Sequence, residues 1–427
     1  LVDNLELSLL LRPNMPSFQL STLAEAVGFS MDILGEEWSG LNLDSNFSEH
    51  NVSRDTLHNA VTDVYVLYRV YDHFLQELTL NGEIQDLLKA FLPEAFDLGA
   101  HFITVDPILL SEWSAHCDWA LNPGYASSPQ VIPTGSALLT NYLSSRGHHP
   151  RPGQLDMQNL IIDAIVRDQY TMIEAPTGTG KTLAYLTAAV YTALKDGRRV
   201  ALSTAYRNLQ DQLLGEIRDL QQHGEVAFRS QLLKGVGNYL CWSQIARYLG
   251  DGALRSGQAG PAVTISERFV LAYVALWLPG SANGTADELS YWLLEALPVA
   301  RSVIHQLRAT AACNPNIQPS CEHCPMPAAY SNAQQAEIVV INHALWLSDP
   351  LRMPPFTCLV LDEAHNLEDV ATSALTQEVS EESLDNLLHK LYDPRTERGL
   401  LIRIRASTRD VDTLKAAAGA LNAVRRV

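Results

Sequence analysis

The feature that most limits how this chain can fold is an eight-residue stretch, APTGTGKT, at residues 175–182. It follows the apolar run YTMIEAP and precedes the helical pattern KTLAYLTAAVYTALKDG, so we expect a strand, a loop and a helix in that order. Gly178 and Gly180 allow backbone N–H groups to surround phosphate oxygens, and the N-terminus of the helix adds its positive dipole end. Lys181 would contact the β- and γ-phosphates of a nucleotide, and Thr182 would bind Mg²⁺. The alternative is a Gly/Thr turn before an unrelated helix.

A second motif, CLVLDEAH at residues 358–365, is an apolar strand pattern that ends in two carboxylates. Asp362 follows Lys181 by 181 positions (362 − 181 = 181) and is placed to hold Mg²⁺ through water. Glu363 is placed to orient and deprotonate an attacking water. An exposed acidic turn is the alternative for this motif alone. Together the two motifs predict hydrolysis of a nucleoside triphosphate, or a relic of that activity. The catalytic residues would be Lys181, Asp362, Glu363 and His365, and the nucleotide- or Mg²⁺-binding residues would be Ala175, Pro176, Thr177, Gly178, Thr179, Gly180, Lys181, Thr182 and Asp362.

From about residue 150 onward, short apolar runs alternate with helical patterns. The runs RRVALST, AEIVVIN and FTCLVLDE read as strands, and Gly197 is well placed to end the helix that follows the glycine-rich loop. This alternation is typical of an α/β fold with a parallel sheet.

The charge of the chain is unevenly distributed. The net charge is 30 − 48 = −18, and residues 1–150 contribute 5 − 19 = −14 of it. Residues 389–427 hold 9 basic and 4 acidic residues, a net +5. Because binding responds to the local field, the acidic total is only weak evidence against nucleic acid.

No apolar run of roughly 18 residues and no signal peptide is present, so we expect a cytoplasmic chain without a membrane span. The chain starts with Leu rather than Met and stops within a helical pattern, LNAVRRV, so we expect a piece of a larger protein.

Three of the six cysteines lie within twelve residues, in CNPNIQPSCEHC at 313–324. Six cysteines are too few for a disulfide scaffold, and a tight cluster indicates metal ligands. Four thiolates in a small insertion suit zinc or an iron–sulfur cluster, and the spacing does not choose between them. Cys117 and Cys358 are expected to be inert.

In combination, these motifs resemble the DinG/XPD-like helicases of superfamily 2, which translocate on single-stranded DNA. RPGQLDM at 151–157 resembles the segment that reads adenine, which implies a base contact for Gln154. STAYRNLQDQL at 203–213 resembles a motif that touches the DNA backbone, with Thr204 and Gln210 as candidates. LKGVGNYLC and VVINHALWL resemble two further family motifs, although Val236 stands where the family has Arg. The resemblance covers about residues 150–370.

The resemblance also implies a [4Fe–4S] cluster between the two nucleotide motifs. Its ligands would be Cys241, Cys313, Cys321 and Cys324, with zinc as the alternative metal, and the spacing makes Cys321 the least regular of the four. Tyr239 and Trp242 flank the first ligand and are expected to pack around the cluster, with stacking on unpaired bases as the alternative.

Near the N-terminus, HNAVTD at 58–63 resembles the last motif of DnaQ-like 3′–5′ exonucleases. His58 would then be a general base and Asp63 a metal ligand. The earlier motifs of that family are absent from this chain, so we expect this part not to cut DNA by itself. A surface His and Asp on a structural helix is the alternative.

We therefore predict an α/β chain in five parts. They are the C-terminal part of an RNase H-like, DnaQ-like exonuclease domain (1–79), a helical linker region (80–146), a RecA-like ATP-binding lobe (147–237 and 326–366), an inserted helical four-cysteine domain (238–325) and the start of an arch-like helical insertion (367–427). The resemblance implies an ATP-dependent helicase acting 5′–3′ on single-stranded or forked DNA, in repair or replication. We expect the second RecA lobe to be missing, so this polypeptide should bind ATP but hydrolyse it poorly. The alternatives are an ATP-stimulated exonuclease and a redox-responsive DNA-binding scaffold.

Overall fold

The structure is a computed structural model, and it divides the chain into two compact units, Leu1–Leu367 and Glu368–Val427. The residues that it describes are 9, 11, 13–15, 20–26, 70, 73, 76–77, 80–92, 113–117, 119, 134–224, 226–256, 263–310, 323–349, 352–376, 388, 391, 416 and 419–420.

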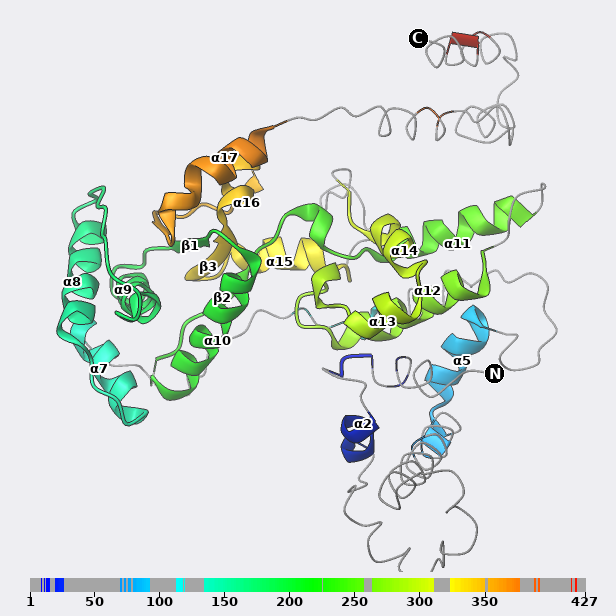
Figure 1. Cartoon of the computed structure of the whole chain (residues 1–427), viewed down its shortest axis with the longest axis horizontal. Coiled ribbons are helices and arrows are strands. Elements are labelled where there is room, and N and C mark those ends of the chain that lie inside the picture. Colours follow the sequence, from blue (N-terminus) through cyan, green and yellow to red (C-terminus); the bar gives the residue numbers. More distant parts are fainter. Residues whose placement is uncertain are drawn as a thin grey trace, which may run out of the picture. The chain divides into compact units, whose positions relative to one another are not determined.

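A parallel four-stranded sheet forms the centre of the nucleotide-binding part (Figure 1). Its order is β2-β3-β1-β4, with β1 at Val200–Thr204, β2 at Ser230–Leu232, β3 at Ile338–Asn342 and β4 at Cys358–Leu361. In register, Val200 pairs with Ile338 on one side and with Cys358 on the other. β1 is buried throughout, as expected of a central strand in a parallel sheet. The predicted α/β fold is confirmed, and three of its strands were expected.

Helices pack against this sheet and against each other. They are α7 (Gly135–Ser145), α8 (Pro152–Val166), α9 (Lys181–Asp196) and α10 (Arg207–His223). α8 begins with Pro at its first position, where the missing N–H costs nothing. α9 ends at Gly197, which takes a left-handed conformation with φ 63°. The expected helix terminator is therefore confirmed.

The apolar run YTMIEAP does not form the expected strand. Residues 169–176 carry no regular secondary structure, and Tyr170 and Met172 are fully exposed. An apolar run becomes a strand only when a neighbouring strand satisfies its backbone groups, and no strand among the described residues pairs with this run. The loop and helix of the motif form without it.

The inserted region between β2 and β3 is helical. It contains α11 (Trp242–Ser256), α12 (Ile265–Trp277), α13 (Tyr291–Ala296), α14 (Ala300–Leu307) and α15 (Pro325–Ala333), with short 3₁₀ turns η4 (Val236–Asn238), η5 (Leu278–Gly280) and η6 (Ala286–Glu288). α12 starts with a capping box between Thr264 and Glu267, and its residues from Phe269 onward are buried.

Parts of the N-terminal region contact this insertion. The described helices there are α2 (Leu20–Ala26) and α5 (Gly82–Phe91), and α5 packs against α12. The Tyr273 hydroxyl of α12 donates to the Pro13 carbonyl at 2.8 Å. His58 and Asp63 lie outside the described residues.

After β3 come α16 (His343–Ser348), η9 (Ala364–Asn366) and α17 (Leu367–Leu375). Among the described residues, no helix is long and apolar enough to cross a membrane. The cytoplasmic location stays a prediction.

Candidate functional site

The glycine-rich loop has the backbone shape that a phosphate cradle needs. Gly178 and Gly180 have φ angles of 77° and 86°, in the left-handed region that a side chain disfavours. α9 begins directly after Gly180, so the N-terminus of a 16-residue helix faces this loop. The Thr179 hydroxyl donates to the Pro176 carbonyl at 2.6 Å, and the Arg151 guanidinium donates to the Gly178 carbonyl. The predicted residues Ala175, Pro176 and Thr177 enter the same loop, and Pro176 and Thr177 are exposed.

The two carboxylates of the second motif come to this loop. Lys181 Nζ lies 3.1 Å from Glu363 Oε1 and donates a hydrogen bond to it. The Asp362 backbone N–H donates to the Ser203 carbonyl at 2.8 Å, which extends the pairing of β4 with β1 by one residue. Segments about 180 residues apart in the chain thus place a cation, two carboxylates and a helix N-terminus together.

Tyr185 connects the two predicted Mg²⁺ ligands. Its hydroxyl donates to Asp362 Oδ2 at 3.1 Å and also interacts with the side chain of Thr182. The hydroxyl is buried, and burial together with the neighbouring Asp362 raises its pKa. Sequence reasoning missed this residue, although its place one helical turn after Lys181 puts it on the same face of α9.

Burial raises the pKa of Asp362, and the neighbouring Glu363 charge raises it further, while Tyr185 and Lys181 partly oppose this. Glu363 adopts a left-handed backbone with φ 55°, which is uncommon for a residue other than Gly. His365 Nδ1 lies 3.3 Å from Glu363 Oε2. The acidic motif thus places Asp362 in a partly buried position beside Glu363, where a cation would stabilise its charged form.

The buried side chain of His343 forms hydrogen bonds with the backbone of the acidic motif and with β1. His343 Nε2 lies 3.0 Å from the Asp362 carbonyl, and His343 Nδ1 lies 2.7 Å from Ser203 Oγ. A carbonyl oxygen only accepts, so Nε2 carries the proton and Nδ1 accepts from the Ser203 hydroxyl. Burial lowers the pKa of His343, which keeps the ring neutral. The motif VVINHALWL contains this histidine, but no role was predicted for it from the sequence.

Two of the four predicted cluster cysteines meet in the insertion. The Sγ atoms of Cys241 and Cys324 lie 4.0 Å apart, and both residues are buried. This distance is too long for a disulfide, at about 2.0 Å. It is close to the ~3.8 Å between two thiolates on one tetrahedral zinc with Zn–S bonds of about 2.3 Å.

Cys313 and Cys321 lie outside the described residues, and within the part of the chain that is described no three metal-ligating side chains come together. The pair therefore fits a shared metal centre by its burial and convergence, without selecting the metal.

Comparisons with known proteins match both halves of this arrangement. A family model for the DEAD/DEAH box helicase matches residues 155–248, and the DEAD_2 model matches residues 309–384. The ATP-dependent DNA helicase YoaA of Haemophilus influenzae is 31% identical over 57% of this chain and 37% of its own length. The ATP-dependent helicase DinG of Mycobacterium tuberculosis is 31% identical over 62% of this chain and 42% of its own length. In both motifs and in these relatives, the chain is similar to the DinG-like helicases.

A further DinG relative extends the similarity toward the N-terminus. The protein named 3′-5′ exonuclease DinG of Staphylococcus saprophyticus is 24% identical over 89% of this chain and 39% of its own length. The DinG-like chain spans about two fifths of the length of these relatives.

Three residues that were predicted to contact ATP or DNA are buried in this structure. Gln154 is buried, and its Nε2 donates to the Gly180 carbonyl at 3.1 Å, so it braces the phosphate loop. Thr204 and Gln210 are also buried, and the Thr204 hydroxyl donates to the Tyr206 carbonyl at 3.2 Å. The roles of Thr204 and Gln210 as DNA contacts stay predictions.

Tyr239 and Trp242 are buried as well, which fits the expected packing around the cysteines and not base stacking. The exposed aromatic group near the DNA-motif segment is Tyr206, whose hydroxyl lies 3.4 Å from Asn366 Oδ1.

Proposed function

We propose that this chain is the ATP-binding part of an ATP-dependent DNA helicase, which converts ATP hydrolysis into movement on single-stranded or forked DNA. The observation that carries the proposal is the 3.1 Å contact between Lys181 of the phosphate loop and Glu363 of the acidic motif. The names of the YoaA and DinG relatives, ATP-dependent helicases, agree with it. A 5′–3′ polarity rests on the resemblance alone.

The geometry supports a simple order of events for the residues. Without nucleotide, Lys181 pairs with Glu363 and neutralises it. A γ-phosphate, which carries more negative charge than one carboxylate, draws the lysine away and leaves Glu363 free to take a proton from water. Thr182 and Asp362 would hold Mg²⁺, which supplies charge neutralisation at the phosphates when bound. His343 keeps the Asp362 backbone in place through both states.

The test uses the full-length protein and its Lys181→Ala and Glu363→Gln variants. We expect Lys181→Ala to lose ATP binding, and Glu363→Gln to bind ATP while losing turnover and strand separation. Duplexes with a 5′ or a 3′ single-stranded tail report the polarity. A Glu363→Gln protein that unwinds DNA at the parental rate would contradict the assignment. The weak hydrolysis expected of the present polypeptide stays a prediction, measured as DNA-stimulated ATP turnover.

We also propose that Cys241, Cys313, Cys321 and Cys324 hold a [4Fe–4S] cluster, with zinc as the alternative. The 4.0 Å approach of Cys241 and Cys324 supports a common metal centre. Anaerobic purification with iron and zinc quantified per chain decides between them. About four irons per chain with broad absorbance would support the cluster, and one zinc per chain would support a structural zinc site. A chain that holds neither metal would contradict both assignments.

A second candidate activity for the whole protein is 3′–5′ exonuclease action. It is favoured by the similarity, over 89% of this chain, to a protein named for that activity. His58 and Asp63 would be its residues here. Cleavage of 3′-labelled DNA by the full-length protein, with His58→Ala as the variant, tests it, and equal cleavage by both proteins would reject the assignment.

A further inference from the structure

The segment WSAHCDW at residues 113–119 lies far from the cysteine pair in sequence and was expected to be part of a linker. The structure describes Trp113–Cys117 and Trp119 of it. These residues contact the neighbours of both Cys241 and Cys324. The segment is anchored at its start by Trp113, whose indole N–H donates to the Ala275 carbonyl of α12 at 2.8 Å.

One contact reaches the Cys241 side. Cys117 is buried, and its thiol interacts with the indole N–H of Trp242, the residue directly after Cys241. That indole N–H is itself buried and has no hydrogen-bond partner among the described residues. Cys117 is therefore the polar neighbour that lies beside an unsatisfied donor next to Cys241.

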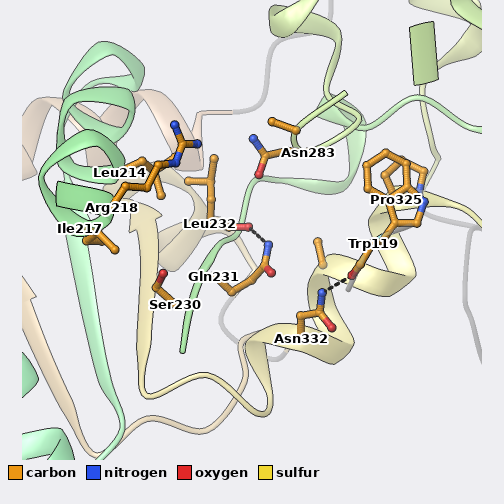
Figure 2. Close-up of a pocket in the computed structure, with 12 residues that line it drawn as sticks. Trp119, Leu214, Ile217, Arg218, Ser230, Gln231, Leu232, Asn283, Pro325 and Asn332 are labelled. Atoms are coloured by element: carbon orange, nitrogen blue, oxygen red, sulfur yellow. Dashed lines mark hydrogen bonds between the residues drawn. The ribbon is translucent and has the colours of Figure 1, made fainter. Parts of the chain in front are cut away.

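A second contact reaches the Cys324 side (Figure 2). The Trp119 indole N–H donates to the carbonyl of His323, directly before Cys324, at 2.9 Å. Asn332 of α15 donates to the Trp119 carbonyl at 2.6 Å. Figure 2 shows the Trp119 ring lying against Pro325, the residue directly after Cys324.

The absence of a side chain at Gly284 leaves space for the Trp119 ring. Gly284 has φ 66°, and a Cβ there would collide with Pro325 and would lie 2.9 Å from Trp119 Cη2. The Gly284 carbonyl also accepts from the Leu240 backbone N–H at 2.9 Å, next to Cys241. One glycine therefore touches the Trp119 ring, the Cys324 side and the Cys241 side of the centre.

A cavity of about 220 Å³ lies beside this ring. Its lining includes polar side chains of Arg218, Gln231, Asn283 and Asn332, together with Trp119 and Pro325 (Figure 2). A cavity of this volume with a polar lining can hold water and small solutes. Among the lining residues, Pro325 directly follows Cys324 in the chain, and Trp119 donates to the carbonyl of the residue before Cys324.

We propose that Trp113–Cys117 and Trp119 form a strap that completes the wall of the cysteine centre and limits the access of small solutes to the metal held there. This inference rests on the proposed metal role of Cys241 and Cys324. Trp119 acts as the barrier, while Trp113 and Cys117 hold the strap against α12 and Trp242. The strap also ties the N-terminal third of the chain to the metal centre.

The experiment measures metal release from the anaerobically purified chain. Iron and zinc are first quantified in the wild type and in Cys241→Ser, and the rate of release to a colour-forming chelator is then followed. We expect Trp119→Ala to speed release by roughly tenfold, in the range known for residues that support metal ligands. Cys117→Ser should have a smaller effect. Trp292→Phe, a half-buried tryptophan of α13 outside the strap, is the matched control and should release at the parental rate.

A second variant guards against misfolding. Asn332→Ala removes the hydrogen bond to the Trp119 carbonyl but keeps the ring, and it should speed release by a smaller factor. ATP binding, measured in the same samples, should not change, because the indole hydrogen bonds of Trp113 and Trp119 go to Ala275 and His323 and not to the phosphate loop. Parental release rates in folded Trp119→Ala and Asn332→Ala proteins would overturn the strap alone. A wild-type chain without metal, identical to Cys241→Ser, would overturn the metal centre and the strap with it.

Discussion

At the residue scale, the neighbours of Asp362 act on its pKa in opposite directions. Burial and Glu363 raise its pKa, whereas the Tyr185 hydroxyl and Lys181 stabilise its charged form. Magnesium binding requires the ionised carboxylate, so its affinity should fall as pH drops through the raised pKa of Asp362, at a higher pH than for an ordinary carboxyl group.

Tyr185→Phe removes one of the two groups that stabilise this charge. We expect Mg²⁺-dependent binding of an ATP analogue to weaken by about tenfold near neutral pH, because a hydrogen bond to a charged group contributes about 1.5 kcal/mol. The loss of binding on acidification should also begin at a higher pH. Titration calorimetry from pH 5.5 to 8 measures both effects. Tyr191→Phe, on the same helix with its hydroxyl bonded to the exposed Lys195, is the control.

His343 makes a second pH-dependent contribution. Its folded pKa is lowered by burial, so below about pH 6.5 the unfolded chain takes up a proton that the folded chain does not. Stability should therefore fall as pH drops from about 6.5 toward the folded pKa of His343. His343→Asn should be less stable at pH 7.5 by about 1–3 kcal/mol, because the Ser203 hydroxyl and the Asp362 carbonyl lose their partner.

The same variant should show a flatter pH dependence of the unfolding free energy between pH 6.5 and 5.5. Urea unfolding at several pH values measures this, with the exposed His149→Asn as the control. An unchanged slope in His343→Asn would show that the ring is not kept neutral by its surroundings.

At the element scale, strand pairing decides which apolar runs enter the sheet. Met172 is 98% exposed in the run before the phosphate loop, whereas Leu202 of β1 is 1% exposed. Met172→Lys should change the free energy of unfolding by less than about 0.5 kcal/mol. Leu202→Ala should lower it by about 2–5 kcal/mol. Urea unfolding of this chain measures both, and a large loss in Met172→Lys would place that run in the sheet.

This difference also shows how much of the fold and of the candidate site could be predicted from the sequence. Local signals sufficed for the loop and for α9 with its Gly197 terminator, since these depend on neighbours in the chain. The apolar runs of β1, β3 and β4 were predicted correctly because each also has a pairing partner in the sheet. The strand predicted at residues 170–174 was wrong because strand formation depends on a pairing partner, and hydrophobic periodicity does not reveal that partner. Tyr185 and His343 were missed because their roles depend on contacts with Asp362, 177 and 19 residues away in sequence.

At the scale of the whole molecule, one buried ion pair joins the nucleotide-binding part to the cysteine insertion. Lys234 lies two residues after the end of β2 and is 6% exposed, and its Nζ lies 2.8 Å from Asp287 Oδ2 and 3.2 Å from Thr285 Oγ1. Although burial opposes it, hydrogen bonds from Lys234 and Thr285 lower the pKa of Asp287. The stability that this carboxylate contributes is present above its unfolded pKa and is lost as pH falls through its lowered folded pKa.

Lys234→Met should therefore destabilise the chain by about 3–5 kcal/mol, because it leaves a half-buried carboxylate without its cation. The double variant Lys234→Met/Asp287→Leu should recover much of this loss. Arg167→Met, which breaks an exposed pair with Asp163, should cost less than about 1 kcal/mol. Chemical unfolding compares the three, and a double variant no more stable than Lys234→Met would argue against charge burial as the cause.

The position of β4 has a practical consequence for handling the protein. β4 is the last strand of the sheet among the described residues, and its four apolar residues, CLVL, are only half-buried. An open, apolar strand edge is a template on which another chain can add a strand. Preparations of this polypeptide should accordingly self-associate as their concentration rises, and light scattering will register that growth well before any loss of ATP binding.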